Sequence, residues 1–330
     1  MTIPSFKILK KNAAERVAAA EHSQKTVLIY AGIVTALAAL VTLVNVTLDL
    51  QISQLGGLSN MGLRSILSTI QSVLPMVQGL FIMCLELGYI AAMLRISRQQ
   101  YTTPQTMKLG FDRFWVLLRF SLVQSAIYML AAIAACWIAT QVYLITPFSD
   151  AIMSMVTPEM ADPNVVMDLL QDPVFTSQMV SAMVPLLVIV GILYAVVCIP
   201  ITYSLRMCRY VIIDKPGKGA VFAIKESRKM MKGSRMRLFK LDVSLWWWFA
   251  ISFGSTILAY GDSILPMLGI SLPFSTDAAY LIFYGLYLIV QFIACYFLRN
   301  RVEVVYAQVY NALKPREQDN GVVLGNIFQM

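Results

Sequence analysis

The chain has 330 residues, of which 58% are hydrophobic and only 13% are charged, and its formal net charge is +8. A mean hydropathy of +0.69 excludes an ordinary soluble globule, because so apolar a chain needs lipid as its solvent. The excess of basic residues does not by itself indicate a nucleic-acid partner, since anionic lipid also attracts basic segments beside a membrane. We therefore predict an integral membrane protein without a nucleic-acid partner.

The N-terminal segment, residues 1–25, is basic and precedes the first long apolar run. Apolar residues such as Phe6, Leu9 and Val17 are interspersed with Lys10 and Arg16. This pattern predicts an amphipathic helix that lies on the inner leaflet of the membrane.

Six apolar runs follow, each long enough to cross a hydrocarbon core of about 30 Å as a helix of roughly 20 residues. Open strands are excluded because their unpaired backbone groups cannot be solvated by lipid. The predicted fold class is therefore all-α, a polytopic transmembrane helical bundle. Its six predicted spans are residues 26–48, 73–94, 120–144, 183–205, 241–260 and 278–298.

The distribution of basic residues predicts the orientation of these spans. All of the 26 lysines and arginines except Arg64 fall in residues 1–25, 95–119, 206–240 and 299–316. Because basic loops stay on the cytoplasmic side, both termini are predicted to be cytoplasmic. The predicted organisation is a cytoplasmic segment at 1–25, a transmembrane domain at 26–299 and a cytoplasmic tail at 300–330.

The cytoplasmic segment 206–240 is the most basic part of the chain. A helix is predicted from Ala220 to Met231, and Gly233 suits the position just after its end. Such a helix should lie along the membrane with its cations toward phosphates. Its predicted partners are anionic lipids of the inner leaflet, or a membrane protein of unknown identity. The basic residues proposed to face them are Lys225, Arg228, Lys229, Lys232, Arg235 and Arg237.

Glu86 is the clearest ionisable residue inside a predicted span. A charged group at such a depth is costly, so it is a functional hypothesis by default. One interpretation makes Glu86 a proton or cation site along a transport path. The other, which we favour, pairs Glu86 with Arg119 at the start of the third span, because neighbouring antiparallel helices bring these depths together.

No familiar catalytic or cofactor pattern occurs in the sequence. The single histidine, His22, and five cysteines without a CxxC pair do not match the usual metal or haem sites. A Ser/His triad, a phosphate-binding loop and an HExxH motif are also missing. We predict a protein that is not an enzyme and holds no cofactor.

Two stretches resemble a known family. They are LGYIAAMLRIS within residues 87–97 and MMKGSRMRLFKLDVS at residues 230–244. Both resemble the bacterial integral membrane family of domain of unknown function 975, which is known mainly from Firmicutes. The resemblance implies a multi-span membrane protein and supplies no catalytic residues.

Two functions remain open at this point. The preferred one is a non-enzymatic scaffold, regulator or assembly factor whose basic cytoplasmic surface faces lipid or a partner. The alternative is a transporter or permease subunit with a polar site near Glu86, which is also motivated by the helix-breaking Pro200 in the fourth span.

Overall fold

The structure is a computed structural model that describes residues 4–20, 22–55, 61–150, 173–267, 270, 273 and 275–314. Throughout these residues the regular elements are helices, which confirms the predicted all-α class. The chain divides into two compact units. The first contains residues 1–117 and 207–330, and the second contains residues 118–206.

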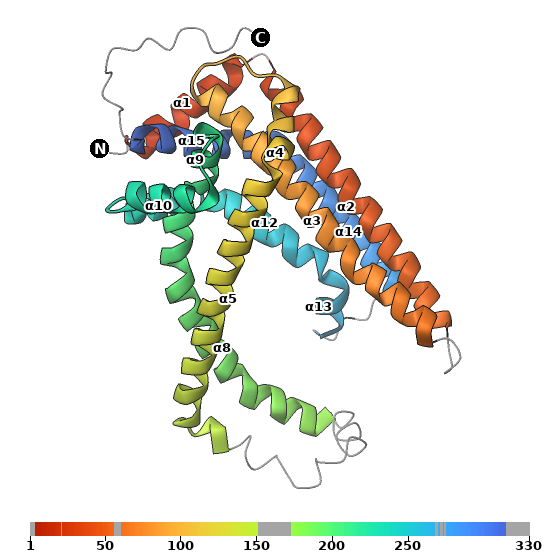
Figure 1. The fold of residues 1–330 in the computed structure, drawn as a ribbon. Helices are drawn as coiled ribbons and strands as arrows, with labels where there is room; N and C mark the ends of the chain where they lie inside the picture. The colour runs from red at the N-terminus through yellow and green to blue at the C-terminus, as the bar shows by residue number, and fades with distance from the viewer. Residues whose placement is uncertain are drawn as a thin grey trace. The chain divides into compact units, whose positions relative to one another are not determined.

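Three long helices form the centre of the first unit. They are α2 (Ser23–Gln54), α3 (Met61–Ser97) and α14 (Thr276–Ala294). Helix α2 packs against both of the others, and Figure 1 shows the three running side by side. Their long, predominantly apolar sequences explain both the helices and the predicted spans at 26–48, 73–94 and 278–298.

After α3 the chain packs back onto that helix. The short helices η2 (Pro104–Lys108) and α4 (Leu109–Asp112) both contact α3. Glycines make this approach possible: a Cβ at Gly88 would lie 2.2 Å from the Met107 carbonyl oxygen, and one at Gly110 would lie 1.8 Å from that of Cys84. Backbone atoms therefore fill the space that a side chain would need.

The fifth predicted span differs from the prediction. Residues 241–260 do not form one straight helix, because α11 (Arg235–Ser244) and α12 (Trp246–Ala259) meet at an angle of 69° around Leu245. Helix α12 alone has 14 residues, about 21 Å at 1.5 Å per residue. The short helix α13 (Gly261–Met267) follows it, and both contact α14.

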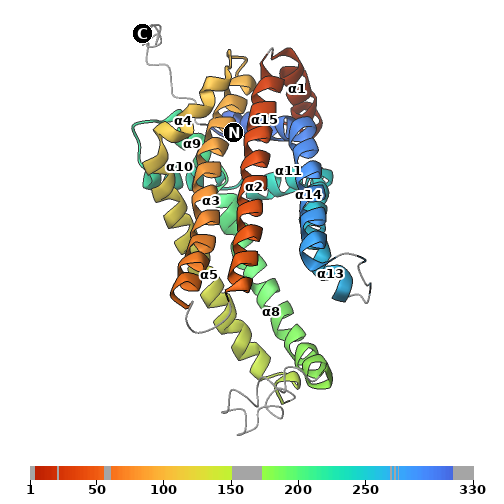
Figure 2. The ribbon, with the colours of Figure 1, turned by 90° about the vertical axis from the view of Figure 1, so that its right-hand side faces the viewer.

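The two terminal helices lie together at the end of the bundle where α2 begins and α3 ends (Figure 2). Helix α1 (Phe6–Ala19) packs against α15 (Asn300–Leu313), which continues from α14 through the π-helical turn η4 (Cys295–Arg299). Part of the predicted tail is thus a helix with most of its side chains buried. Residues 315–330 of that tail lie outside the described residues.

The second unit contains α8 (Pro173–Leu205) and most of α5 (Phe114–Leu144). The Tyr128 hydroxyl lies 2.8 Å from that of Thr202, and the Tyr143 hydroxyl donates to the Ala182 carbonyl at 2.7 Å. Many large apolar side chains on both helices are exposed, as on helices that face lipid. These helices contain the predicted spans 120–144 and 183–205.

Candidate functional site

Glu86 lies at the centre of a cluster of charged side chains. Its Oε2 is 2.8 Å from Nη1 of Arg209, which belongs to helix α9 (Cys208–Asp214). Its Oε1 is 3.0 Å from Nη2 of Arg299 at the end of η4. We call Glu86, Arg209 and Arg299 the charge cluster. Its ion pairs join three segments that lie far apart in the sequence.

Two tyrosines complete the surroundings of Arg299. The guanidinium carbon lies 4.9 Å from the ring centre of Tyr30 and 5.4 Å from that of Tyr89. These two buried rings stack on each other with their centres 4.5 Å apart. A cation over aromatic faces gains electrostatic attraction, so Arg299 is held by the rings as well as by Glu86.

The partners of Glu86 differ from the one proposed from the sequence. Both carboxylate oxygens bind arginines of the first unit, whereas Arg119 belongs to the second unit. The Glu86–Arg119 pair stays a prediction. Arg209 and Arg299 could have been found as cations that follow the fourth and sixth apolar runs, at the same predicted side of the membrane as Glu86.

A second ionic cluster forms around Asp214 at the end of α9. Its carboxylate accepts hydrogen bonds from Arg98 at 2.6 and 3.0 Å and from the Tyr310 hydroxyl at 3.0 Å, and it pairs with Lys314 at 2.8 Å. Asn311 accepts from Arg98 at 3.0 Å. This arrangement joins the ends of α3, α9 and α15, and bidentate pairing makes it geometrically specific.

Basic side chains also bind the last carbonyl groups of several helices. Lys10 donates to the Ser244 carbonyl at 2.5 Å, and Arg16 donates to that of Ser97. Arg113 likewise donates to the Ile212 carbonyl in the last turn of α9 at 2.5 Å. Carbonyl groups at helix C-termini lack partners within the helix and attract cations. Helix α1 therefore stabilises the ends of α3 and α11.

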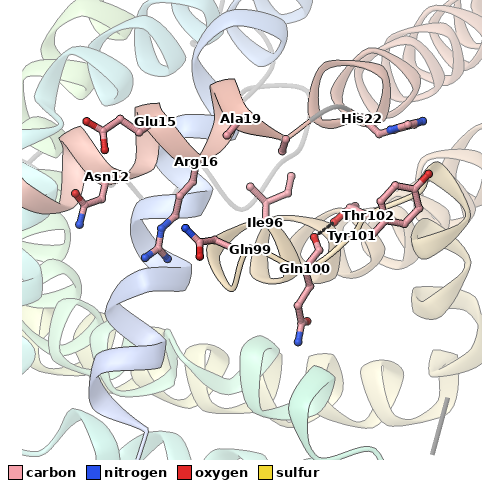
Figure 3. Close-up of a pocket in the computed structure, with 11 residues that line it drawn as sticks. Asn12, Glu15, Arg16, Ala19, His22, Ile96, Gln99, Gln100, Tyr101 and Thr102 are labelled. Carbon is pink, nitrogen blue, oxygen red and sulfur yellow. Dashed lines mark hydrogen bonds between the residues drawn. The ribbon is translucent and has the colours of Figure 1, made fainter. Parts of the chain in front are cut away.

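A cleft of about 670 Å³ lies between α1 and the turn that follows α3 (Figure 3). Arg16 and Gln99 point toward each other across it, and the rings of His22 and Tyr101 meet edge to face with centres 5.5 Å apart. Gln99 adopts a positive φ of 57°, which turns the chain after α3. The lining mixes polar and apolar side chains, and its charged residues, Glu15 and Arg16, have opposite signs. In the described part of the chain no group of three or more metal-binding side chains occurs.

The basic surface comprises six side chains, which lie on α10 (Ala220–Met231), on α11 and in the turn between these helices. One side of α10 is buried against α9 through residues including Ala223, Ile224 and Met231. The six cations predicted from the sequence are all exposed, and none forms a salt bridge within the residues that the structure describes: Lys225, Arg228, Lys229, Lys232, Arg235 and Arg237.

Apolar side chains share this exposed side of α10 and α11. Met236 is 65% exposed, Val221 59% and Phe239 41%. Where α10 and α11 meet, a groove of about 460 Å³ is lined by Arg228, Lys232, Gly233, Arg235 and Met236. Cations interspersed with exposed apolar side chains are typical of a surface that meets lipid headgroups.

The helices define the class of protein. Among the residues that the structure describes, five helices are long and apolar enough to cross a membrane, and the bent pair α11 and α12 makes six if it is counted as one span. The chain is therefore a helical membrane protein with several candidate spans. It belongs to the family described as protein of unknown function (DUF975), whose model matches residues 23–317. Searches of curated proteins and of solved structures found no match.

Proposed function

We propose that this protein is a non-enzymatic scaffold of the bacterial cytoplasmic membrane, with both termini in the cytoplasm, whose basic surface binds anionic phospholipid headgroups of the inner leaflet. The observation that carries the proposal is the exposure of all six predicted cations on α10 and α11. Each cation close to an anionic leaflet contributes about 1 kcal/mol of attraction.

The bend between α11 and α12 supports this placement. Helix α12 is strongly apolar, whereas α11 carries Arg235, Arg237 and Lys240. An angle of 69° lets α11 follow the membrane plane while α12 enters the hydrocarbon. Met236 and Phe239 would then insert among the acyl chains beside their charged neighbours.

The proposed orientation of the chain in the membrane rests on the distribution of its basic residues. The bundle end that holds α1, α10, α11 and α15 carries most of the basic residues, and cytoplasmic loops retain lysine and arginine. A reagent that modifies thiols but cannot cross membranes tests this orientation in intact cells. Asp150→Cys should react from outside, whereas Lys218→Cys should react only after lysis; the reverse pattern would refute the proposed orientation.

The transporter alternative is less well supported. Both oxygens of Glu86 bind arginines, so this carboxylate is committed to ion pairs that join α3, α9 and η4. Helix α8 also continues through Pro200. A structural role for Glu86 accounts for these contacts without a transported ion.

Lipid selectivity tests the proposed function. The purified full chain would be mixed with equal amounts of phosphatidylglycerol and phosphatidylcholine, and bound lipids counted by native mass spectrometry. We expect a preference for phosphatidylglycerol that weakens in high salt, since salt screens exposed charges. A variant with all six cations changed to Gln should lose the preference. Equal binding of both lipids by the wild-type chain would refute the proposal.

A matched control keeps this result specific to the basic surface. Lys7, Lys11 and Lys108 are exposed cations of the same unit that lie outside α10 and α11. Changing these three to Gln should leave most of the selectivity in place. A loss as large as that of the six-residue variant would show that the selectivity does not depend on the basic surface.

A further inference from the structure

Three of the six cations converge where α10 and α11 meet. Arg228 lies in the last turn of α10, Lys232 follows that helix, and Arg235 is the first residue of α11. Gly233 has a φ of +82°, a conformation that glycine adopts without strain, and it reverses the chain between them. Among the described residues, no acidic side chain lines the resulting groove of about 460 Å³.

The neighbouring hollow on the other side of α10 provides a contrast. It has a volume of about 190 Å³ and is lined by Lys215, Lys229 and Lys314 together with Glu226 and Tyr310. Lys314 is already paired with Asp214. An anion there would approach the Glu226 carboxylate, so its electrostatic attraction would be partly cancelled.

Met236 gives the groove an apolar side. Its side chain is 65% exposed and lies beside Arg235, while Val221 and Phe239 are exposed elsewhere on the same two helices. A free phosphate ion would contact only the cations. A phospholipid would also cover this apolar surface with its glycerol and acyl carbons, which are removed from water on contact.

We infer that the groove formed by Arg228, Lys232, Arg235 and Met236 holds the phosphate diester of one anionic phospholipid, as a defined site within the basic surface. This inference rests on the proposed function and adds a specific location to it. Arginines bind phosphate oxygens through two parallel N–H groups, and Lys232 adds a mobile point charge. The other three cations of the surface, Lys225, Lys229 and Arg237, act as a diffuse attraction for the leaflet.

Two variants with equal loss of charge test the site. The groove variant carries Arg228→Gln, Lys232→Gln and Arg235→Gln, and the flank variant carries Lys225→Gln, Lys229→Gln and Arg237→Gln. Native mass spectrometry of the full chain gives the dissociation constant of the first phosphatidylglycerol. We expect about tenfold weaker binding or more in the groove variant and a change of less than about threefold in the flank variant. Thermal unfolding of both variants in detergent checks that they are folded.

A competition arm distinguishes lipid from other sources of phosphate. Inorganic phosphate and glycerol 1-phosphate should displace the lipid only at far higher concentration, and Met236→Gln should weaken lipid binding without changing the affinity for inorganic phosphate itself. Displacement by inorganic phosphate at the concentration of the lipid would overturn the lipid assignment.

The outcomes separate this inference from the proposed function. Equal weakening in the groove and flank variants, with selectivity lost in the six-residue variant, would overturn the groove and leave the basic surface as proposed. Retained selectivity in the six-residue variant would overturn both. Loss confined to the groove variant supports both.

Discussion

The charge cluster and the basic surface contain similar residues in opposite environments. In the charge cluster, Arg209 and Arg299 are bound to Glu86, and Arg299 also lies over two buried rings. On the basic surface, cations such as Arg228 and Arg235 are exposed and form no salt bridge in the described part of the chain. Arginines that follow apolar helices can therefore join helices together or face the surroundings, and a count of basic residues does not separate the two roles.

This difference leads to opposite expectations for mutation. The ion pairs of the charge cluster are partly buried, and removing one partner of such a pair is costly because it leaves the other charge without compensation. Exposed cations contribute about 1 kcal/mol or less to folding and can be replaced with small effect. Mutations in the charge cluster should change stability, and mutations in the basic surface should change lipid binding.

The largest effect is expected for Glu86→Gln. This change leaves Arg209 and Arg299 without their shared carboxylate, which should lower the free energy of unfolding by about 3 kcal/mol. The folded yield and the thermal unfolding temperature in detergent measure it. Arg209→Gln should cost less, because Glu86 keeps Arg299. A stable Glu86→Gln protein that had lost transport of an ion would instead favour the transporter alternative.

A smaller but clear loss is expected for Gly88→Ala, two residues beyond Glu86 on α3. The new Cβ would meet backbone atoms of Met107 at 2.2 Å, so α3 and η2 must separate. Overpacking of this kind costs about 1–3 kcal/mol. Gly79→Ala on the same helix is a matched control, since no atom lies within 4 Å of its Cβ position. Equal unfolding temperatures of the two variants would contradict the close approach of α3 and η2.

The smallest effect is expected for Lys10→Met. The variant loses the hydrogen bond from Lys10 to the Ser244 carbonyl, which should cost about 1 kcal/mol. Limited proteolysis would report loosening of α1, with cleavage faster than in the wild-type chain. Lys7→Met removes an exposed cation from the same helix and should leave the cleavage rate unchanged. Equal acceleration by both changes would show that charge on α1, rather than this contact, holds the helix.

Hydropathy predicted the long helices well because α2, α3, α5, α8 and α14 each contain a long stretch of high mean hydropathy. The bend at Leu245 could not be predicted in the same way, since no glycine or proline marks it. Contacts from distant parts of the chain surround it instead: Lys10 binds the Ser244 carbonyl, and the Tyr306 hydroxyl donates to Asp242 at 2.6 Å. Tertiary structure thus overrides a locally uniform sequence.

The candidate sites, too, were predicted in part from the sequence and depend in part on tertiary contacts. The basic composition of residues 206–240 singled out the six cations, which are exposed in the structure, and the place of Glu86 in an apolar run singled out that residue. Its partners come from segments more than a hundred residues away, which one sequence does not bring together. Helix α15 was predicted as a tail because Arg301, Glu303 and Gln308 interrupt its apolar residues, although Val302, Val305 and Val309 recur at helical spacing.

The depth of α11 in a bilayer tests the central claim most directly. A nitroxide attached at Met236→Cys, in a protein whose native cysteines are replaced, would be measured by electron paramagnetic resonance in phosphatidylglycerol bilayers. We predict a depth at the boundary between headgroups and acyl chains, which becomes shallower when the six cations of the basic surface are changed to Gln. A label that is fully accessible to water in both proteins would contradict the claim that the basic surface lies on the leaflet.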